Sequence, residues 1–418
     1  MSMSFENLEV LSPAGDRERL EAAVEFGADA VYLAGTAFGM RAGPKNFDEA
    51  GLESAVSYCH DRGVKVHLAC NTLPRNSEIA GFECFIRCGE ECGVDAAIIA
   101  DMGVMAMAKR FAPGLAVHMS TQTGIVNYEA ARQLHELGAS RVVLARELSL
   151  EEIAEIRAKT PGDLEIEAFV HGAMCVSFSG RCLLSQYLNG RDPNRGQCSQ
   201  PCRWSYSLME ETRPGQYFPI EEDGRGTYIL NAKDMCMIDH LDKLAKAGVT
   251  SFKIEGRAKS AYYVSVVTGA YRRAVDLLKG DPDNYRLPED IRNEVFKVSH
   301  RDYCTGFYFT SPSDPGAAVQ TYKNGGYIRE WDVCAVVREC RDGRIYAEQR
   351  NKFCEGDVVE ILAPFSPPVA MKAAGLRDDE GMAIDDTRHA AMRFSMGNPS
   401  GTDFPGGSII RKQVGGEA

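Results

Sequence analysis

The 418-residue sequence has no run of about 18 consecutive apolar residues, the length that a membrane helix requires. Its first nine residues contain two acidic side chains and lack the basic and apolar regions of a secretory signal peptide. Positive charge is not in excess either, since 47 Lys and Arg stand against 59 Asp and Glu. We therefore expect a cytoplasmic protein with no membrane segment, in which any nucleic acid binds at a local basic site.

Several catalytic motifs are also missing. The sequence contains no H-E-x-x-H zinc motif and no G-x-S-x-G nucleophile motif, and no Gly-rich dinucleotide fingerprint follows the first expected strand. These absences count against a zinc peptidase, a serine hydrolase and a Rossmann fold. Paired C-x2-C knuckles, which are typical of structural zinc sites, are absent as well, although the chain has 14 cysteines.

What the sequence does contain is a regular alternation of short apolar runs and amphipathic stretches. The apolar runs predict strands at 8–11, 30–33, 64–70, 96–100, 116–120, 142–145, 164–170 and 251–254. The amphipathic stretches predict helices at 17–26, 47–59, 78–92, 103–111, 128–137, 150–159, 237–246 and 261–278. Eight successive strand–helix units predict an α/β protein with a parallel (β/α)8 TIM-like barrel.

Two regions depart from this alternation. A cysteine-rich insertion at 175–235 follows the seventh strand, and β-type runs at 333–339, 344–349, 357–362 and 409–411 follow the barrel. Arg341, Asp342 and Gly343 predict a hairpin turn between the first two of these runs. We therefore expect a barrel domain at 1–315 and a small antiparallel β-barrel domain at 316–418.

Four of the cysteines are grouped in the insertion. Cys175, Cys182, Cys198 and Cys202 follow the pattern C-x6-C-x15-C-x3-C among Gly and Pro residues, so a packed core does not explain them. In a reducing compartment they are not a disulfide framework. Four irregularly spaced thiolates are typical of an iron–sulfur cluster, while zinc, inert thiols and a catalytic thiol remain alternatives. The segment begins where strand seven ends, which is the active-site rim of a barrel.

Polar residues gather near the carboxyl ends of the expected strands and predict a substrate cavity there. Side chains two positions apart share one face of a strand, which groups polar residues along strands five, seven and eight. The candidate catalytic residues are Glu167, His171, Lys253, Glu255 and Arg257, and the candidate substrate-binding residues are Asn71, His118, Gln122, Arg146, Arg181 and Lys259. The unperturbed pKa of histidine lies near neutrality, which makes His171 a candidate general acid or base, and Arg257 and Lys259 suit an anionic group. The alternatives are ion pairs and hydrogen bonds that only fill the barrel.

Specific motifs run along nearly the whole chain. Residues 167–175 read EAFVHGAMC and residues 179–185 read SGRCLLS. The sequence also has LSPAG at 11–15, GADAVY at 27–32, RDPN at 191–194, CRW at 202–204 and KIEGR at 253–257. With these motifs the chain resembles the peptidase U32 family, long labelled collagenase-like proteases.

The resemblance is strongest to the tRNA-hydroxylating branch of that family. It implies oxygen-independent 5-hydroxylation of the tRNA wobble uridine, with prephenate, a small dicarboxylate, as co-substrate and a [4Fe–4S] cluster. By motif, Cys175, Cys182 and Cys198 would be three ligands, and the fourth would be Cys202 or, as in another branch, Cys236. The expected partners are tRNA and the small dicarboxylate co-substrate, with a second family member as partner subunit left as an open alternative.

Three alternatives remain at this point. One is a U32-type peptidase with a cysteine nucleophile, for which a dyad of Cys175 and His171 is conceivable from their spacing. Another is a related hydroxylase that acts on ribosomal RNA or a small aromatic compound. The last is a cluster-bearing scaffold without catalytic activity of its own.

Overall fold

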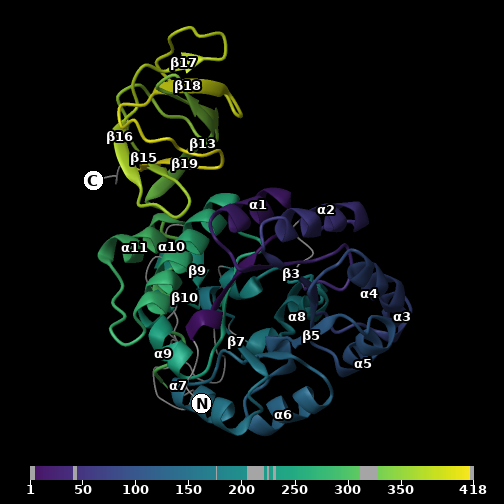
Figure 1. Cartoon of the computed structure of the whole chain (residues 1–418). Helices are drawn as coiled ribbons and strands as arrows, with labels where there is room; N and C mark the ends of the chain where they lie inside the picture. The colour runs from purple at the N-terminus through teal and green to yellow at the C-terminus, as the bar shows by residue number, and fades with distance from the viewer. Residues whose placement is uncertain are drawn as a thin grey trace.

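The structure, a computed structural model, describes residues 5–40, 45–175, 177–204, 221–223, 226–228, 232–310 and 327–414. Its central element is a closed parallel barrel (Figure 1). The barrel strands are β1 (Glu9–Pro13), β2 (Ala30–Leu33), β3 (Lys65–Cys70), β4 (Ala96–Ile99), β5 (Ala116–Met119), β6 (Arg141–Val143), β7 (Glu165–Ala173) and β11 (Ser251–Ile254). The last strand closes the ring, because Ser251 is in register with Glu9 of β1 and with Glu167 of β7. The predicted TIM-like barrel is confirmed.

Helices connect the strands and cover the barrel. They are α1 (Arg17–Glu25), α2 (Glu49–His60), α3 (Asn76–Ile79), α4 (Phe82–Glu91), α5 (Met102–Phe111), α6 (Tyr128–Glu136), α7 (Leu150–Lys159), α9 (Leu241–Lys246), α10 (Ala261–Gly280) and α11 (Glu289–Glu294). Most begin at an Asp, Asn or Ser whose side chain accepts a hydrogen bond from a backbone N–H of the first turn, as at Asp16, Asp101 and Ser149. None of the described helices is both long and apolar enough to cross a membrane.

Two local features differ from the sequence expectations. The single helix expected at 78–92 is divided into α3 and α4 at Ala80–Gly81, where Gly81 begins the second helix. Strand β7 is longer than expected, and its last residues pair with an additional antiparallel strand, β10 (Asp234–Cys236). β10 in turn pairs with β12 (Tyr303–Cys304), so the barrel sheet continues for two strands beyond β7.

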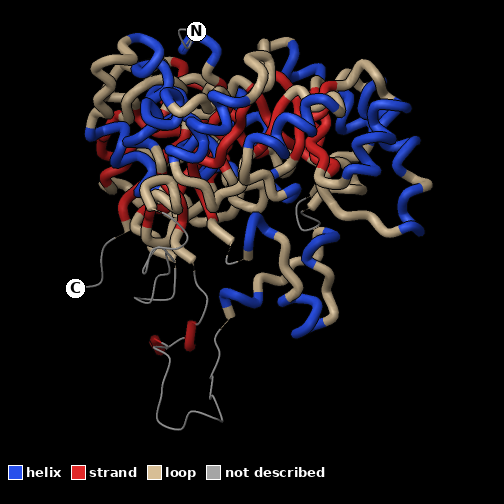
Figure 2. Tube along the Cα trace, turned by 90° about the horizontal axis from the view of Figure 1, so that it is seen from below, coloured by secondary structure: helices blue, strands red, loops and turns tan. Residues whose placement is uncertain are grey.

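The insertion after β7 consists of short helices and loops. In its described part these are η3 (Phe178–Gly180), α8 (Leu184–Asn189), η4 (Pro193–Arg195) and η5 (Pro201–Arg203), followed by the hairpin β8 (Glu221–Asp223) and β9 (Gly226–Tyr228). Figure 2 shows these short helices as a lobe that projects from one side of the barrel. The insertion therefore stands at an opening of the barrel rather than within its wall.

The C-terminal region is a separate antiparallel half-barrel with its own core. Its strands are β13 (Trp331–Arg341), β14 (Arg344–Gln349), β15 (Val358–Leu362), β16 (Val369–Lys372), β17 (Arg377–Asp378), β18 (Arg393–Gly397) and β19 (Ile409–Gln413), in the sheet order β16-β15-β19-β13-β14-β18-β17. The turn between β13 and β14 is formed by Asp342 and Gly343, both with positive φ, as the sequence predicts. The domain boundary predicted at 315/316 lies outside the described residues.

The half-barrel is attached to the helical layer of the barrel beside α1, α10 and α11 (Figure 1). Buried Arg411 of β19 donates hydrogen bonds to Glu294 of α11 at 2.8 Å and to Glu360 of β15 at 2.7 Å. Lys297 Nζ lies 2.8 Å from Glu360 and 3.0 Å from Glu294. Leu362 and Ile409 of the half-barrel also belong to the apolar core of the barrel. Apolar contacts and these charges thus join the two parts.

Candidate functional site

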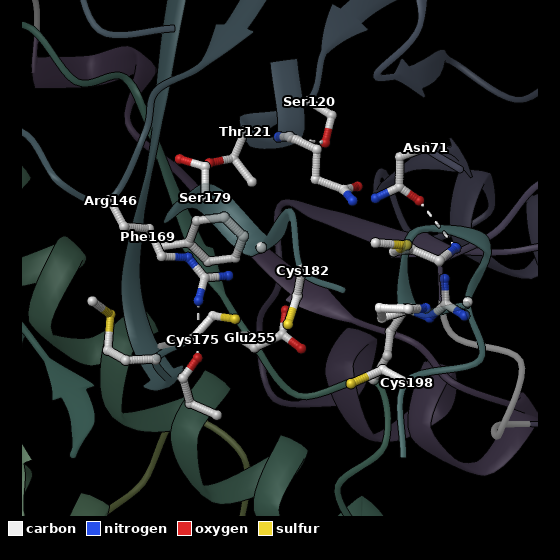
Figure 3. A pocket seen from close by; sticks show the side chains of 18 of the residues that line it. Asn71, Ser120, Thr121, Arg146, Phe169, Cys175, Ser179, Cys182, Cys198 and Glu255 are labelled. Carbon is white, nitrogen blue, oxygen red and sulfur yellow. Dashed lines mark hydrogen bonds between the residues drawn. The ribbon is translucent and has the colours of Figure 1, made fainter. Parts of the chain in front are cut away.

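A pocket of about 250 Å³ opens at the carboxyl ends of the barrel strands. Strands β2, β3, β4, β5, β6, β7 and β11, or the loops that follow them, contribute lining residues, and so does the insertion. In a (β/α)8 barrel this end carries the functional residues, because eight independent loops meet there. Figure 3 shows Cys175 and Cys182 from the insertion together with Arg146, Phe169 and Glu255 from the barrel around this space.

All four grouped cysteines line the pocket. Cys175 and Cys198 are exposed, and Cys182 and Cys202 are half-buried. Two of the sulfurs accept backbone hydrogen bonds: Leu184 N–H donates to Cys182 Sγ at 3.3 Å, and Gln200 N–H donates to Cys198 Sγ at 3.4 Å. Hydrogen bonds to the ligating sulfurs are among the features by which proteins tune iron–sulfur clusters. Two of the four cysteines thus have a backbone N–H directed at their sulfur.

Cys236 lies elsewhere. It sits in β10, does not line the pocket, and its Sγ is 3.9 Å from the hydroxyl of Tyr271. Although Cys236 as a residue is only partly buried, burial of its thiol raises the pKa to about 12. Of the two candidates for a fourth ligand, only Cys202 shares the pocket with the other three cysteines.

The fit of a metal group follows from this donor set. Among the described residues, no three His, Cys, Asp or Glu side chains are gathered closely enough to hold one metal ion. The four cysteines instead line one pocket, and backbone N–H groups donate to the sulfurs of Cys182 and Cys198. This chemistry suits a multi-iron cluster, whose ligands lie around a larger body than a single ion.

Side chains of the insertion anchor it to the barrel loops. Ser179 donates from its N–H and its hydroxyl to the carboxylate of Glu147, at 2.7 and 2.8 Å. Arg181 Nε donates to the carbonyl of Gln122, and Arg195 forms an ion pair with Glu78 of α3. Asn194 binds both the N–H and the carbonyl of Cys182, at 3.2 and 2.9 Å. The cysteine segment is thus held against the barrel opening by polar contacts with specific partners.

Three cations and one carboxylate line the pocket. Arg146 donates from Nη1 to the carbonyl of Ala173 at 2.9 Å and lies 3.8 Å above the ring of Phe169, while its buried Nε has no hydrogen-bond partner among the described residues. Arg257 is buried and donates to Asn46 Oδ1 at 2.9 Å. Lys253 and Glu255 complete the set. As the sequence predicts, Lys253, Glu255 and Arg257 face one cavity.

Nearer the amino ends of the strands lies an ion network that is buried except at Glu165, and we call it the lower layer: Glu9, Arg141, Glu165, Glu167 and Lys253. Lys253 Nζ is 2.6 Å from Glu167, and Arg141 is 3.1 Å from Glu167 and 2.7 Å from Glu9. Burial alone would raise the pKa of Glu167, but the charges of Lys253 and Arg141 outweigh it and hold the pKa below its usual value. Glu167 is therefore an ionised partner of these cations, and it does not line the pocket.

Two histidines that the sequence suggested for the site do not line the pocket. His171 is 1% exposed and lies within hydrogen-bond distance of the hydroxyls of Tyr271 and Tyr303, at 3.3 and 3.4 Å. Burial lowers its pKa to about 3, so the ring is neutral at physiological pH. His118 is packed edge-on against His67, and burial lowers its pKa as well. The roles predicted for His171 and Glu167 in catalysis and for His118 in substrate binding therefore find no support in the geometry.

The remaining candidates divide into two groups. Asn71 and Gln122 line the pocket, and Asn71 Oδ1 accepts a hydrogen bond from the N–H of Met40 at 3.2 Å. Arg181 and Lys259 do not line it: Arg181 binds the loop of Gln122, and Lys259 lies 4.2 Å above the ring of Tyr327.

Two family models match most of the chain. The model of peptidase family U32 matches residues 15–317, and that of the U32 C-terminal domain matches residues 329–411. The chain belongs to peptidase family U32. It is 34% identical over 383 residues to tRNA hydroxylation protein P1 of Bacillus subtilis, covering 91% of this chain and 89% of the relative. It is 35% identical over 398 residues to tRNA hydroxylation protein P of Escherichia coli, covering 85% and 86%. It is also 35% identical over 393 residues to a collagenase of Porphyromonas gingivalis, covering 90% and 91%.

Tyr32 and Met40 are among the residues of this U32 pocket that were not candidates from the sequence. Tyr32 lines it from β2, and its hydroxyl donates to the carbonyl of Ile254 at 2.9 Å. Met40 lines it from the loop after β2. Tyr32 stands within an expected strand, so its aromatic ring resembled ordinary barrel packing, while Met40 lies in a connection without a recognisable motif.

Proposed function

We propose that this U32 protein hydroxylates C5 of the wobble uridine in tRNA, without molecular oxygen and with prephenate as co-substrate. In this proposal Cys175, Cys182, Cys198 and Cys202 hold a [4Fe–4S] cluster. The observation that carries it is the meeting of these four cysteines with basic side chains in one pocket at the barrel rim. The names of the relatives in Bacillus subtilis and Escherichia coli support tRNA as the substrate.

The surface of the insertion supports an RNA substrate. Tyr187 is 81% exposed and Trp204 is 41% exposed, in the same segment that carries the cysteines. Arg181 and Arg191 are exposed in this segment too. Single-stranded RNA is bound by stacking of its unpaired bases on aromatic rings and by guanidinium contacts. A nucleotide turned out of the anticodon loop would meet these side chains before its base reaches the pocket.

Arg146 supports an anionic co-substrate in the pocket. Its Nε is buried without a described partner, and its guanidinium is fixed by the Ala173 carbonyl and the Phe169 ring. A guanidinium held in one orientation binds a carboxylate through paired hydrogen bonds. Arg257 lines the same pocket and would serve the second carboxylate of a dicarboxylate.

When bound, the cluster would supply either electron transfer or a Lewis-acidic iron. The chain's own residues have other tasks. Arg146 and Arg257 bind and orient the anion, and the insertion closes one side of the pocket. Asn194 and Glu147 hold the cysteine segment in place through Cys182 and Ser179.

The cofactor proposal is tested by anaerobic purification with iron and sulfide assays. A [4Fe–4S] protein contains about four of each per chain and absorbs broadly near 400 nm. Cys182→Ala and Cys202→Ala should lose this absorption, whereas Cys236→Ala should keep it, because Cys236 lies outside the pocket. Full iron content in Cys202→Ala together with loss of iron in Cys236→Ala would identify Cys236 as the fourth ligand. A colourless protein under strict anaerobiosis would refute the cluster.

The reaction is tested by nucleoside analysis in a strain that lacks its own tRNA 5-hydroxyuridine activity. Expression of this chain should restore 5-hydroxyuridine in tRNA and leave ribosomal RNA unchanged. Restoration should require the cysteines and should fail in a strain that makes no prephenate. Appearance of the product in ribosomal RNA instead would favour the ribosomal RNA alternative. Absence of product from both RNAs would refute RNA hydroxylation by this chain alone.

Peptidase activity is the second candidate, because one relative is named a collagenase and the thiol of Cys175 is exposed. The geometry does not support the dyad considered from the sequence. His171 lies outside the pocket that Cys175 lines and is bound by Tyr271 and Tyr303. A cysteine peptidase needs a base within hydrogen-bond distance of its thiol. Cleavage of gelatin by the purified protein that disappears in Cys175→Ala would restore this candidate.

A further inference from the structure

Gln122 is a buried pocket residue whose side chain has no described partner. It is 4% exposed, it lines the pocket, and neither Nε2 nor Oε1 has a hydrogen-bond partner among the described residues. Burying a carboxamide with both its donor and its acceptor unsatisfied is unfavourable, and native proteins rarely do so without a reason. A ligand that pairs with both atoms supplies that reason.

The turn that carries Gln122 is held in place by hydrogen bonds of the neighbouring side chains and of its own backbone. It is the short helix η2 (Thr121–Thr123), which follows β5. The Thr121 hydroxyl donates to the Leu144 carbonyl at 3.0 Å, and the Thr123 hydroxyl donates to the Ala100 carbonyl at 3.4 Å. The carbonyl of Gln122 itself accepts from Arg181 of the insertion. Both neighbouring side chains thus anchor the turn, whereas the Gln122 carboxamide lines the pocket without a described partner.

The two unpaired atoms of the Gln122 side chain, the donor Nε2 and the acceptor Oε1, restrict the chemistry of the ligand. A carboxylate or phosphate only accepts hydrogen bonds, so it would pair with Nε2 and leave Oε1 unsatisfied. A planar ring edge with adjacent N–H and C=O groups satisfies both atoms at once, as carboxamide side chains do with nucleobases. A lactam edge therefore matches the Gln122 carboxamide better than an anion does, whereas an anion matches Arg146.

We infer that Gln122 binds the edge of the target base, and this inference rests on the proposed function. With uracil, Oε1 accepts from N3–H and Nε2 donates to an adjacent ring carbonyl, which leaves C5 outside the hydrogen-bonded pair. No described residue fixes the orientation of the carboxamide, so it can rotate by a half-turn and exchange the positions of Nε2 and Oε1. In that orientation Nε2 donates to N3 of cytosine and Oε1 accepts from its amino group. Gln122 thus selects a pyrimidine edge, and the choice between uracil and cytosine lies with other residues.

The test measures binding of the anaerobically purified full-length protein to an anticodon-arm RNA hairpin. The wobble position carries either uridine or 3-methyluridine, which lacks the N3–H donor. Methylation should weaken binding to the unsubstituted protein roughly ten- to hundredfold, the range expected for a bidentate base contact. Gln122→Leu should bind the uridine hairpin more weakly by a similar factor and should be indifferent to the methyl group. Gln122→Glu keeps the shape of the side chain and should also lose affinity.

Gln133→Leu is the matched control, because Gln133 is exposed on α6 and bonded to Glu136, so it should behave like the unsubstituted protein. Equal binding of the two hairpins, or methyl discrimination that persists in Gln122→Leu, would overturn the inference. Mass spectrometry of the same RNA separates the two proposals. Methyl-sensitive binding without 5-hydroxyuridine leaves the inference standing and refutes the reaction, whereas product without methyl sensitivity does the reverse. Failure to bind the uridine hairpin at all overturns both.

Discussion

The two ends of the barrel interior differ in whether their buried polar side chains are paired. In the lower layer, Glu167 and Arg141 are almost fully buried and form ion pairs with each other and with neighbouring charges. In the pocket, Gln122 and Arg146 keep buried nitrogen or oxygen atoms without described partners, and two cysteines are exposed. The same strands build both ends. The difference indicates that the amino-end charges serve stability, while the carboxyl-end groups are kept for ligands.

Glu167→Ala should produce the largest effect, and it should be an effect on stability. The substitution leaves Lys253 and Arg141 buried without one of their counter-charges. Breaking a buried ion pair in this way costs about 3–5 kcal/mol. Urea unfolding of the metal-free protein measures the loss.

Glu165→Ala is the control for that substitution. Glu165 also pairs with Arg141, but its side chain is 48% exposed. Solvent screens such a pair, so the loss should stay below about 1 kcal/mol. Equal losses in the two variants would contradict the distinction between a buried lower layer and its exposed margin.

Arg146→Ala should show the opposite profile, with a small change in unfolding free energy and a large change in activity. The variant loses the bond to Ala173 and the cation above Phe169. If Arg146 binds the anionic co-substrate, kcat/KM for that compound should fall roughly ten- to hundredfold, since hydrogen bonds to charged groups contribute about 1.5–3 kcal/mol. Steady-state kinetics over a co-substrate series measures it. A loss of stability as large as that of Glu167→Ala, with kinetics unchanged, would place Arg146 with the structural charges.

His171→Phe should have a small effect that depends on pH. The pKa of His171 is lowered from 6.5 to about 3 by burial, so the unfolded chain binds a proton that the folded chain does not. The contribution of this group to stability is therefore present above pH 6.5 and is lost as the pH falls. Between pH 7 and 5.5 the unsubstituted protein should lose about 1 kcal/mol more than the variant. Parallel curves of unfolding free energy against pH would contradict the assignment of a neutral, structural His171.

Much of the fold could be predicted from the sequence, because local patterns specify it. The strand at Ala30–Leu33 and the strand at Arg344–Gln349 have the bounds expected from their apolar pattern. The Asp342–Gly343 turn follows from the tolerance of these residues for positive φ. The cysteine spacing likewise placed a group of thiols at the rim of the barrel, and the structure gathers them in one pocket.

The site was less predictable because alternation along a strand gives the face of a residue but not its depth. Glu167 and His171 both belong to β7, yet one lies in the lower layer and the other contacts tyrosines outside the pocket. A register shift of β11 against β7, between Lys253 and Ile254, contributes to this difference. One of the two charged partners of Glu167 was also unforeseen, because Arg141 comes from β6 and nothing in the sequence links the two residues.

The lower layer also bears on the order in which the protein folds. Arg141 joins Glu9 of the first strand to Glu167 of the seventh, and Ser251 of the last strand donates to Glu9 at 2.7 Å. Strand β11 follows the whole insertion in the chain, so the ring cannot close before the cysteine segment has been synthesised. Contacts between residues so distant in sequence form slowly. The ion network is therefore incomplete until β11 brings Lys253 and Ser251 into the ring.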